Sequence, residues 1–177
     1  MALARRLHHV AIEVSDMDGS IQFYRDLLGL KLSERHAAGE VAEIPVELAF
    51  LRLHDNHHDL VLAHNPTKRY SKAQRADQDG PVACHHIAFE YPDRDAWLAQ
   101  LEQVKALGID IIRGPIIHSA YQPGGEGSWG ENESFYLLDP DEHRIEMFCN
   151  MGKIDADGYL QDGADGRRLG DTKVAET

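Results

Sequence analysis

Apolar and polar residues alternate over residues 7–14, LHHVAIEV, and this period of two predicts a β-strand. A helical pattern follows in DMDGSIQFYRDLLG, where Asp16 offers an N-cap and Gly29 a stop. The apolar stripe of this helix consists of Ile21, Tyr24, Leu27 and Leu28. Three extended runs then cover residues 30–35, 45–53 and 59–64. The first part of the chain therefore predicts the order strand, helix and three strands.

The same order returns in the second part of the chain. Residues 86–91 alternate as a strand, and a helical pattern runs from Asp93 to Gly108. Its apolar stripe consists of Trp97, Leu101, Val104 and Leu107. Three further runs cover residues 109–117, 134–138 and 144–148. The repetition predicts an α+β fold of two βαβββ modules, related by a pseudo-twofold axis and forming a shared cleft.

The predicted domain is a single one over residues 1–151. Module one covers about residues 5–65, a polar linker about 66–82, and module two about 83–151. Residues 152–177 are rich in Gly and Asp with few apolar side chains, which predicts a tail that is ordered only if something holds it.

Composition narrows the possible partners. Hydrophobic residues make up 42% of the chain, enough for a core, and the net charge of −12 argues against binding to nucleic acid or to an anionic membrane. No apolar run is long enough to span a bilayer, and two cysteines do not form a disulfide framework. The cytoplasm is the expected compartment. Eleven histidines are many for an acidic chain, and they gain meaning only where they converge.

Two of these histidines take equivalent places in the repeat. His9 and His86 begin the first strand of each module, and Glu146 lies within RIEMF on the last strand. A carboxylate there costs several kcal/mol unless it is paired or bound to a metal. Two imidazoles and one carboxylate match the facial triad of non-haem Fe(II), and Mn(II) suits the same ligands. Alternation places His8 and His85 on the opposite face, as structural residues.

The simpler alternative remains open for each residue of this triad. A histidine at a strand start is more often hydrogen-bonded than metal-bound, and a buried glutamate usually has an arginine partner, for which Arg144 is the nearest in sequence.

The chain resembles the vicinal oxygen chelate superfamily over about residues 5–151, through LHHVAIEV, HHIAFEY and LLDPDEHRIEMFC. Its second half resembles the catalytic part of type I extradiol catechol dioxygenases. The resemblance implies an iron(II)-dependent, ring-cleaving oxidoreductase that acts on a small aromatic diol with O2. It also implies that His9, His86 and Glu146 are the metal ligands.

The extradiol resemblance assigns further residues. His58, in HDL, would act as acid and base, while His118, in GPIIH, and Tyr136 would hydrogen-bond the substrate oxygens. Arg113 precedes this Gly-Pro and could pair with a substrate carboxylate. Trp129 lies in the long loop 119–133, which could close over an aromatic ring or be a variable surface loop. A solvated turn histidine, an exposed arginine and a core tyrosine are the alternatives.

Other reactions of the superfamily stay open. Glyoxalase-type isomerases use a fourth protein ligand from the first module, and laying HDLVL over RIEMF places Leu60 there, which cannot bind a metal. Fosfomycin-type epoxide opening needs only three ligands and is not excluded on this ground. A drug-binding module without catalysis is the third alternative. A homodimer is expected, since this fold has exposed sheet edges.

Overall fold

The structure, a computed structural model, describes residues 4–40, 43–71, 84–127 and 130–174. The chain divides into two compact units. Unit 1 consists of Met1–Ala73 with Asp139–Glu142, and unit 2 of Gln74–Leu138 with His143–Thr177.

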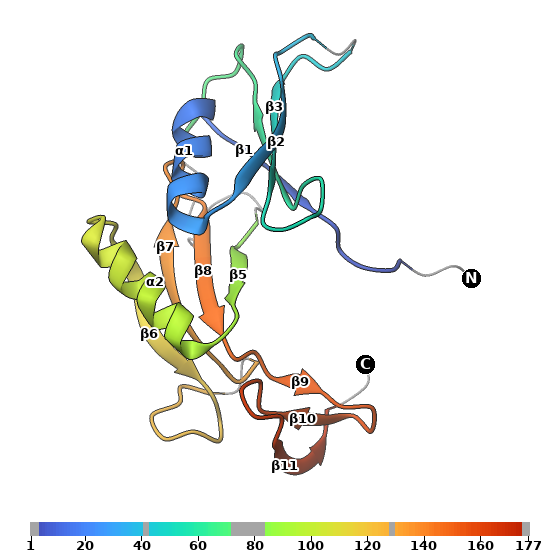
Figure 1. Cartoon of the computed structure of the whole chain (residues 1–177), viewed down its shortest axis with the longest axis vertical. Helices are drawn as coiled ribbons and strands as arrows, with labels where there is room; N and C mark the ends of the chain where they lie inside the picture. The colour runs from blue at the N-terminus through green and yellow to red at the C-terminus, as the bar shows by residue number, and fades with distance from the viewer. Residues whose placement is uncertain (1–3, 41–42, 72–83, 128–129, 175–177) are drawn as a thin grey trace. The chain divides into compact units, whose positions relative to one another are not determined.

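In its described residues, unit 1 consists of one helix and a four-stranded sheet in the order β1-β4-β3-β2. Figure 1 shows α1 with the strands β1, β2 and β3 of this unit. Strands β1 and β4 are parallel, with Val10 opposite Leu60, and the other neighbours are antiparallel. The elements are β1 (Val10–Glu13), α1 (Met17–Leu28), β2 (Lys31–His36), β3 (Glu47–Arg52) and β4 (Leu60–His64).

Unit 2 repeats this plan, with the strand order β5-β8-β7-β6. Strands β5 and β8 are parallel, with Ile87 opposite Ile145. The elements are β5 (Ile87–Tyr91), α2 (Arg94–Ala106), β6 (Ile111–His118), β7 (Asn132–Leu138) and β8 (Arg144–Cys149). The α+β prediction of two βαβββ modules is therefore confirmed, down to the same strand order in both units.

Both helices begin where the sequence predicts. The Asp16 side chain accepts a hydrogen bond from Gly19 N at 3.2 Å, and Asp93 does the same from Ala96 N at 2.8 Å. Gly29 ends α1 in the left-handed region, with φ of 70°, where glycine carries no Cβ penalty.

The buried helix faces differ in part from the predicted stripes. In α1, Met17 and Ser20 are buried while Ile21 and Leu28 are only half-buried. The face that packs on the sheet is therefore turned about the helix axis relative to the predicted stripe. In α2, Gln100 is buried and Leu107 is 54% exposed. Leu107 is the C-cap residue, so it lies beyond the last turn that packs on the sheet.

The core of each unit lies between its helix and its sheet. In unit 1, Leu51 and Leu62 are fully buried. In unit 2, Trp97 is buried and donates a hydrogen bond from Nε1 to the carbonyl of Met147 at 2.9 Å, which fixes α2 against β8.

The turn between β7 and β8 belongs to unit 1. Tyr24 on α1 donates to Asp139 Oδ2 at 2.8 Å, and Ser15 N donates to Asp141 Oδ2 at 2.8 Å. Tyr24 is fully buried and Asp139 is 4% exposed. Burial and the nearby Asp139 raise the pKa of Tyr24 well above its ordinary value, so the phenol stays protonated as a donor.

The C-terminal segment, which the sequence predicts to be ordered only if something holds it, is ordered and has such a contact. Beyond residue 152 it forms the antiparallel sheet β11-β10-β9, made of β9 (Lys153–Ile154), β10 (Tyr159–Gln161) and β11 (Arg168–Lys173). Gly152 N donates to the carbonyl of Gly130 at 2.7 Å, so the sheet is held to the end of loop 119–133. Among the described residues, no helix is long and apolar enough to cross a membrane.

Replacing Tyr24 with Phe is expected to lower the free energy of unfolding by about 1–3 kcal/mol, because the buried Asp139 carboxylate loses a donor. Urea unfolding followed by circular dichroism measures the change. Tyr91→Phe is the matched control, since among the residues that the structure describes the Tyr91 hydroxyl donates to the weak acceptor Met147 Sδ at 3.8 Å. An equal loss of unfolding free energy in both variants would contradict a stabilising hydrogen bond from Tyr24 to Asp139.

The two cysteines should differ in reactivity. Cys84 is exposed, whereas Cys149 is fully buried and burial raises the pKa of its thiol to about 11. We expect one thiol per chain to react with Ellman's reagent in the folded protein and both to react in guanidinium. Rapid labelling that survives Cys84→Ser would count against this.

Candidate functional site

The site in unit 2 is built around Glu146, in the middle of β8. Strand register places Tyr136 on β7 opposite Glu146. Glu146 is only 6% exposed, and both of its carboxylate oxygens have a partner. Oε1 accepts a hydrogen bond from the Tyr136 hydroxyl at 2.8 Å, and Oε2 lies 3.0 Å from His86 Nε2. A carboxylate and an imidazole therefore meet at one place, as two ligands of one metal would.

Two further side chains extend this arrangement. His118 Nε2 lies 3.1 Å from the Tyr136 hydroxyl, and Ser134 Oγ lies 3.4 Å from it. His118 is 2% exposed, and burial lowers its pKa. Burial is also the main cause that raises the pKa of Tyr136, to which the hydrogen bond to Glu146 adds. The neutral imidazole and the protonated phenol thus form a chain that ends on the carboxylate.

His85 lies beside His86 rather than on the opposite face. The Nδ1 atoms of the two rings are 2.7 Å apart, and Arg144 Nη1 lies 3.1 Å from His85 Nε2. Alternation fails because both histidines precede β5, which begins at Ile87. Burial, and after it the charge of Arg144, lower the pKa of His85, so Arg144 pairs with this ring as a donor to a neutral imidazole.

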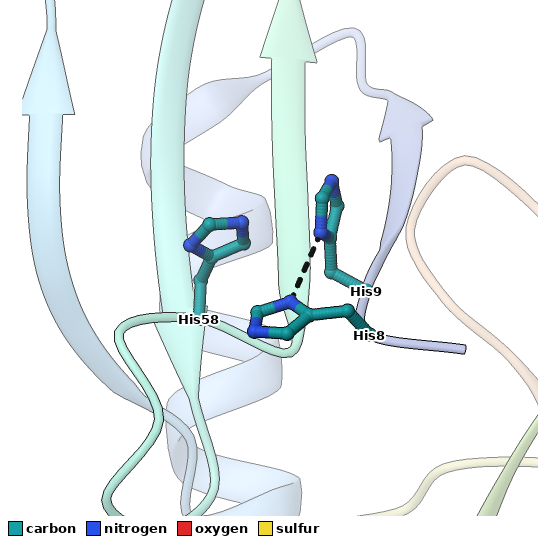
Figure 2. A group of neighbouring side chains, drawn as sticks. All are labelled: His8, His9 and His58. Atoms are coloured by element: carbon teal, nitrogen blue, oxygen red, sulfur yellow. Dashed lines mark hydrogen bonds between the residues drawn. The ribbon is translucent and has the colours of Figure 1, made fainter. Parts of the chain in front are cut away.

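His9 lies in unit 1, together with His58 and His8 (Figure 2). The ring centroids of His9 and His58 are 4.5 Å apart, and His8 Nδ1 lies 3.2 Å from His9 Nδ1. The prediction that His8 points away from His9 is wrong for the same reason as for His85: β1 begins only at Val10.

His58 is half-buried against Phe50, with ring centroids 5.1 Å apart. Burial lowers the pKa of His58, and the neighbouring His9, His57 and His8 lower it further. The ring is therefore suited to accept a proton or to bind a metal at neutral pH.

The predicted substrate contacts are only partly described. Arg113 is exposed, and its guanidinium carbon lies 5.9 Å from the ring centroid of Tyr136. Trp129 lies outside the described residues. The base of its loop is anchored, because Ser119 and Ala120 both donate hydrogen bonds to the buried Glu131.

Strand register corrects one residue assignment. In unit 2, Ala88 on β5 faces Glu146, and in unit 1 the equivalent Ala11 faces Val61. Val61, not Leu60, therefore takes the place of Glu146 in the first module. Valine binds no metal either, so the inference that the first module lacks this carboxylate stands.

The two repeated sheets and the Glu146–His86 pair agree with a comparison of the sequence with models of protein families. The family model described as Glyoxalase/Bleomycin resistance protein/Dioxygenase superfamily matches residues 6–147. The chain belongs to this superfamily. The predicted membership is confirmed, and the C-terminal sheet lies beyond the matched region.

Relatives within the superfamily carry other activities in their names. The chain is 30% identical over 159 residues to a lactoylglutathione lyase of Neisseria meningitidis, covering 87% of this chain and 97% of that protein. It is 27% identical over 145 residues to the glutathione transferase FosA of Serratia marcescens, covering 82% and 81%. The crystal structure of the fosfomycin resistance protein FosX from Listeria monocytogenes, with Mn(II) and sulfate, has a TM-score of 0.55 at 16% identity, covering 84% and 95%. That similarity shows the fold alone.

The structure thus brings His86, Glu146, Tyr136 and His118 together in unit 2, and His9 and His58 in unit 1. Sequence reasoning missed His8 as a neighbour of His9 and His58. The doublet HH just before each strand was the available signal, since two residues ahead of a strand are not bound by its alternation.

The loss of folding stability at acidic pH should depend on His118. Its folded pKa lies below its ordinary value of 6.5, so the unfolded chain takes up this proton at the higher pH. The metal-free protein should therefore lose stability as the pH falls from 6.5 toward the folded pKa. His118→Asn should reduce this slope, measured by urea unfolding at a series of pH values. An unchanged slope in His118→Asn would contradict the shift.

Proposed function

We propose that this chain is a divalent-metal-dependent enzyme in which His86 and Glu146 are metal ligands. The observation that carries the proposal is the buried Glu146 carboxylate, with one oxygen beside His86 and the other beside Tyr136. An oxygen donor with an imidazole suits borderline and hard dications such as Mn(II) and Fe(II). His9 lies in the other unit, and its assignment as third ligand rests on the sequence resemblance.

Residues around the metal ligands have separate tasks. Tyr136 holds Glu146 in one orientation, because a partner of a ligand fixes its geometry. His118 keeps the Tyr136 proton in place and can pass one through that hydroxyl. A bound dication would supply Lewis-acid activation of substrate oxygens.

The reaction that we propose first is the opening of a small oxygenated substrate, such as an epoxide, by water or a thiol. It fits the relative named glutathione transferase FosA. The lyase reaction of the Neisseria relative would need a fourth protein ligand by the resemblance above, and Val61 stands at the place equivalent to Glu146. An assay with fosfomycin and water, glutathione or cysteine, beside an assay for lactoylglutathione formation, separates the two.

Extradiol ring cleavage remains the second candidate. One observation favours it: His118 and Tyr136, two residues that the resemblance assigns to substrate oxygens, lie 3.1 Å apart beside Glu146. Oxygen uptake with catechols by the Fe(II)-loaded protein tests it. Iron, a small aromatic diol, a homodimer and a cytoplasmic location stay predictions.

Glu146→Gln is expected to weaken Mn(II) binding by at least about 100-fold and to abolish activity, since the amide keeps the shape but removes the anionic ligand. Metal content after dialysis and a chelator competition measure it. Glu133→Gln is the matched control on the adjacent strand, because Glu133 pairs with Arg94 at 2.7 Å and not with the site. Mn(II) bound by Glu146→Gln as tightly as by the unchanged protein would refute the proposed centre.

Tyr136→Phe should keep the bound metal but lower kcat by about 10- to 100-fold, because Glu146 loses the partner that orients it. Steady-state kinetics with metal in excess measure the loss. A variant with unchanged kcat would show that the hydroxyl has no part in the reaction.

A further inference from the structure

Three imidazoles gather at one end of unit 1 (Figure 2). His8 and His9 stand just before β1, and His58 stands two residues before β4. Because β1 and β4 are parallel neighbours with Val10 opposite Leu60, their entry points lie side by side. The ring centroid of His8 is 5.4 Å from that of His9 and 5.4 Å from that of His58.

The backbone that presents His58 is fixed. The Asp59 side chain accepts hydrogen bonds from Leu53 N and from Asn56 Nδ2, both at 2.8 Å. The Asp59 carbonyl accepts from Val10 N at 3.1 Å, which joins the His58 loop to the start of β1. The three rings therefore project from two backbone segments that are hydrogen-bonded to each other.

The spacing of the donor atoms fits a transition metal. One nitrogen of each of the three rings lies within 4.8 Å of the others, and the His8 and His9 Nδ1 atoms are 3.2 Å apart. Two imidazole nitrogens bound to a tetrahedral Zn²⁺ are about 3.3–3.4 Å apart. The His8–His9 pair already has this separation. A rotation of the half-buried His58 ring that brings its nitrogen closer by up to about 1.4 Å would complete the set.

The chemistry of the cluster points the same way. Imidazoles that are gathered at a surface repel each other when they are protonated, and the contacts between their ring edges offset only part of this repulsion. One dication bound by all three rings would instead benefit from their close spacing, because neutral imidazole is a preferred ligand of Zn²⁺, Cu²⁺ and Ni²⁺.

We propose that unit 1 binds a borderline transition-metal dication, Zn²⁺ above all, through His8, His9 and His58. The fourth position of the tetrahedron stays open to water or a small anion. The three donors of this site all belong to unit 1, whereas His86 and Glu146 belong to unit 2. His9 is common to this site and to the centre proposed for His86 and Glu146, so a metal in the three-histidine site would withdraw His9 from that centre.

Binding to the Glu146→Gln protein tests this site apart from the proposed function. Metal-free Glu146→Gln is titrated with Co²⁺, whose visible absorption reports tetrahedral nitrogen ligands, and Zn²⁺ then displaces it in competition with a chelator. We expect one bound ion per chain. A further His8→Ala or His58→Ala change should each weaken Zn²⁺ binding by at least about tenfold.

His64→Ala is the matched control in the same protein, because His64 ends β4 at the opposite end from His58 and its Nδ1 lies 3.0 Å from the carbonyl of Val14. It should bind Zn²⁺ as the parent does, and circular dichroism should show all variants folded. Binding unchanged by His8→Ala and His58→Ala, or weakened equally by His64→Ala, would overturn the site. The proposed enzymatic centre fails independently, if Glu146→Gln retains activity.

Discussion

The buried carboxylate of Glu146 is the group on which the arrangement of unit 2 depends. A charge that is 6% exposed must be matched by donors, and the fold supplies them from two neighbouring segments. Tyr136 comes from the antiparallel neighbour β7, and His86 from the residue that precedes the parallel neighbour β5. The strand order and register of unit 2 therefore bring the Tyr136 and His86 side chains to the Glu146 carboxylate.

The same backbone plan carries different donors in the two units. Unit 2 combines an oxygen with an imidazole, whereas unit 1 offers three imidazoles and places Val61 where the carboxylate would be. Ligand softness thus differs between the halves: the first suits zinc-like ions, and the second also suits harder ions such as manganese. The two units therefore share one strand order, while the side chains at equivalent positions differ in the metal ions that they suit.

Much of the fold could be predicted because periodicity and capping are local signals. Asp16 and Asp93 mark the helix starts, and the apolar runs mark the strands, within a few residues. The extradiol resemblance assigned Glu146 and Tyr136 to one site, and the strand register places them opposite each other. The position of His8 could not be predicted, since alternation holds only inside a strand and β1 begins at Val10. Register was equally hidden, which is why a gapless alignment selected Leu60 instead of Val61.

The sheet beyond residue 152 shows another limit of sequence patterns. Two of its three strands have only 2 and 3 residues. The contact that holds it to Gly130 is a backbone hydrogen bond, which cannot be detected in side-chain periodicity.

The turn Asp139–Glu142 has a consequence for how the chain is made. Its contacts to Ser15 and Tyr24 span 126 and 115 residues, so unit 1 is completed only when the segment between β7 and β8 has been synthesised. Much of unit 2 has by then already been made. Until Asp139 is added to the chain, the Tyr24 hydroxyl lacks its final partner, and the nascent first module is exposed to chaperones and proteases.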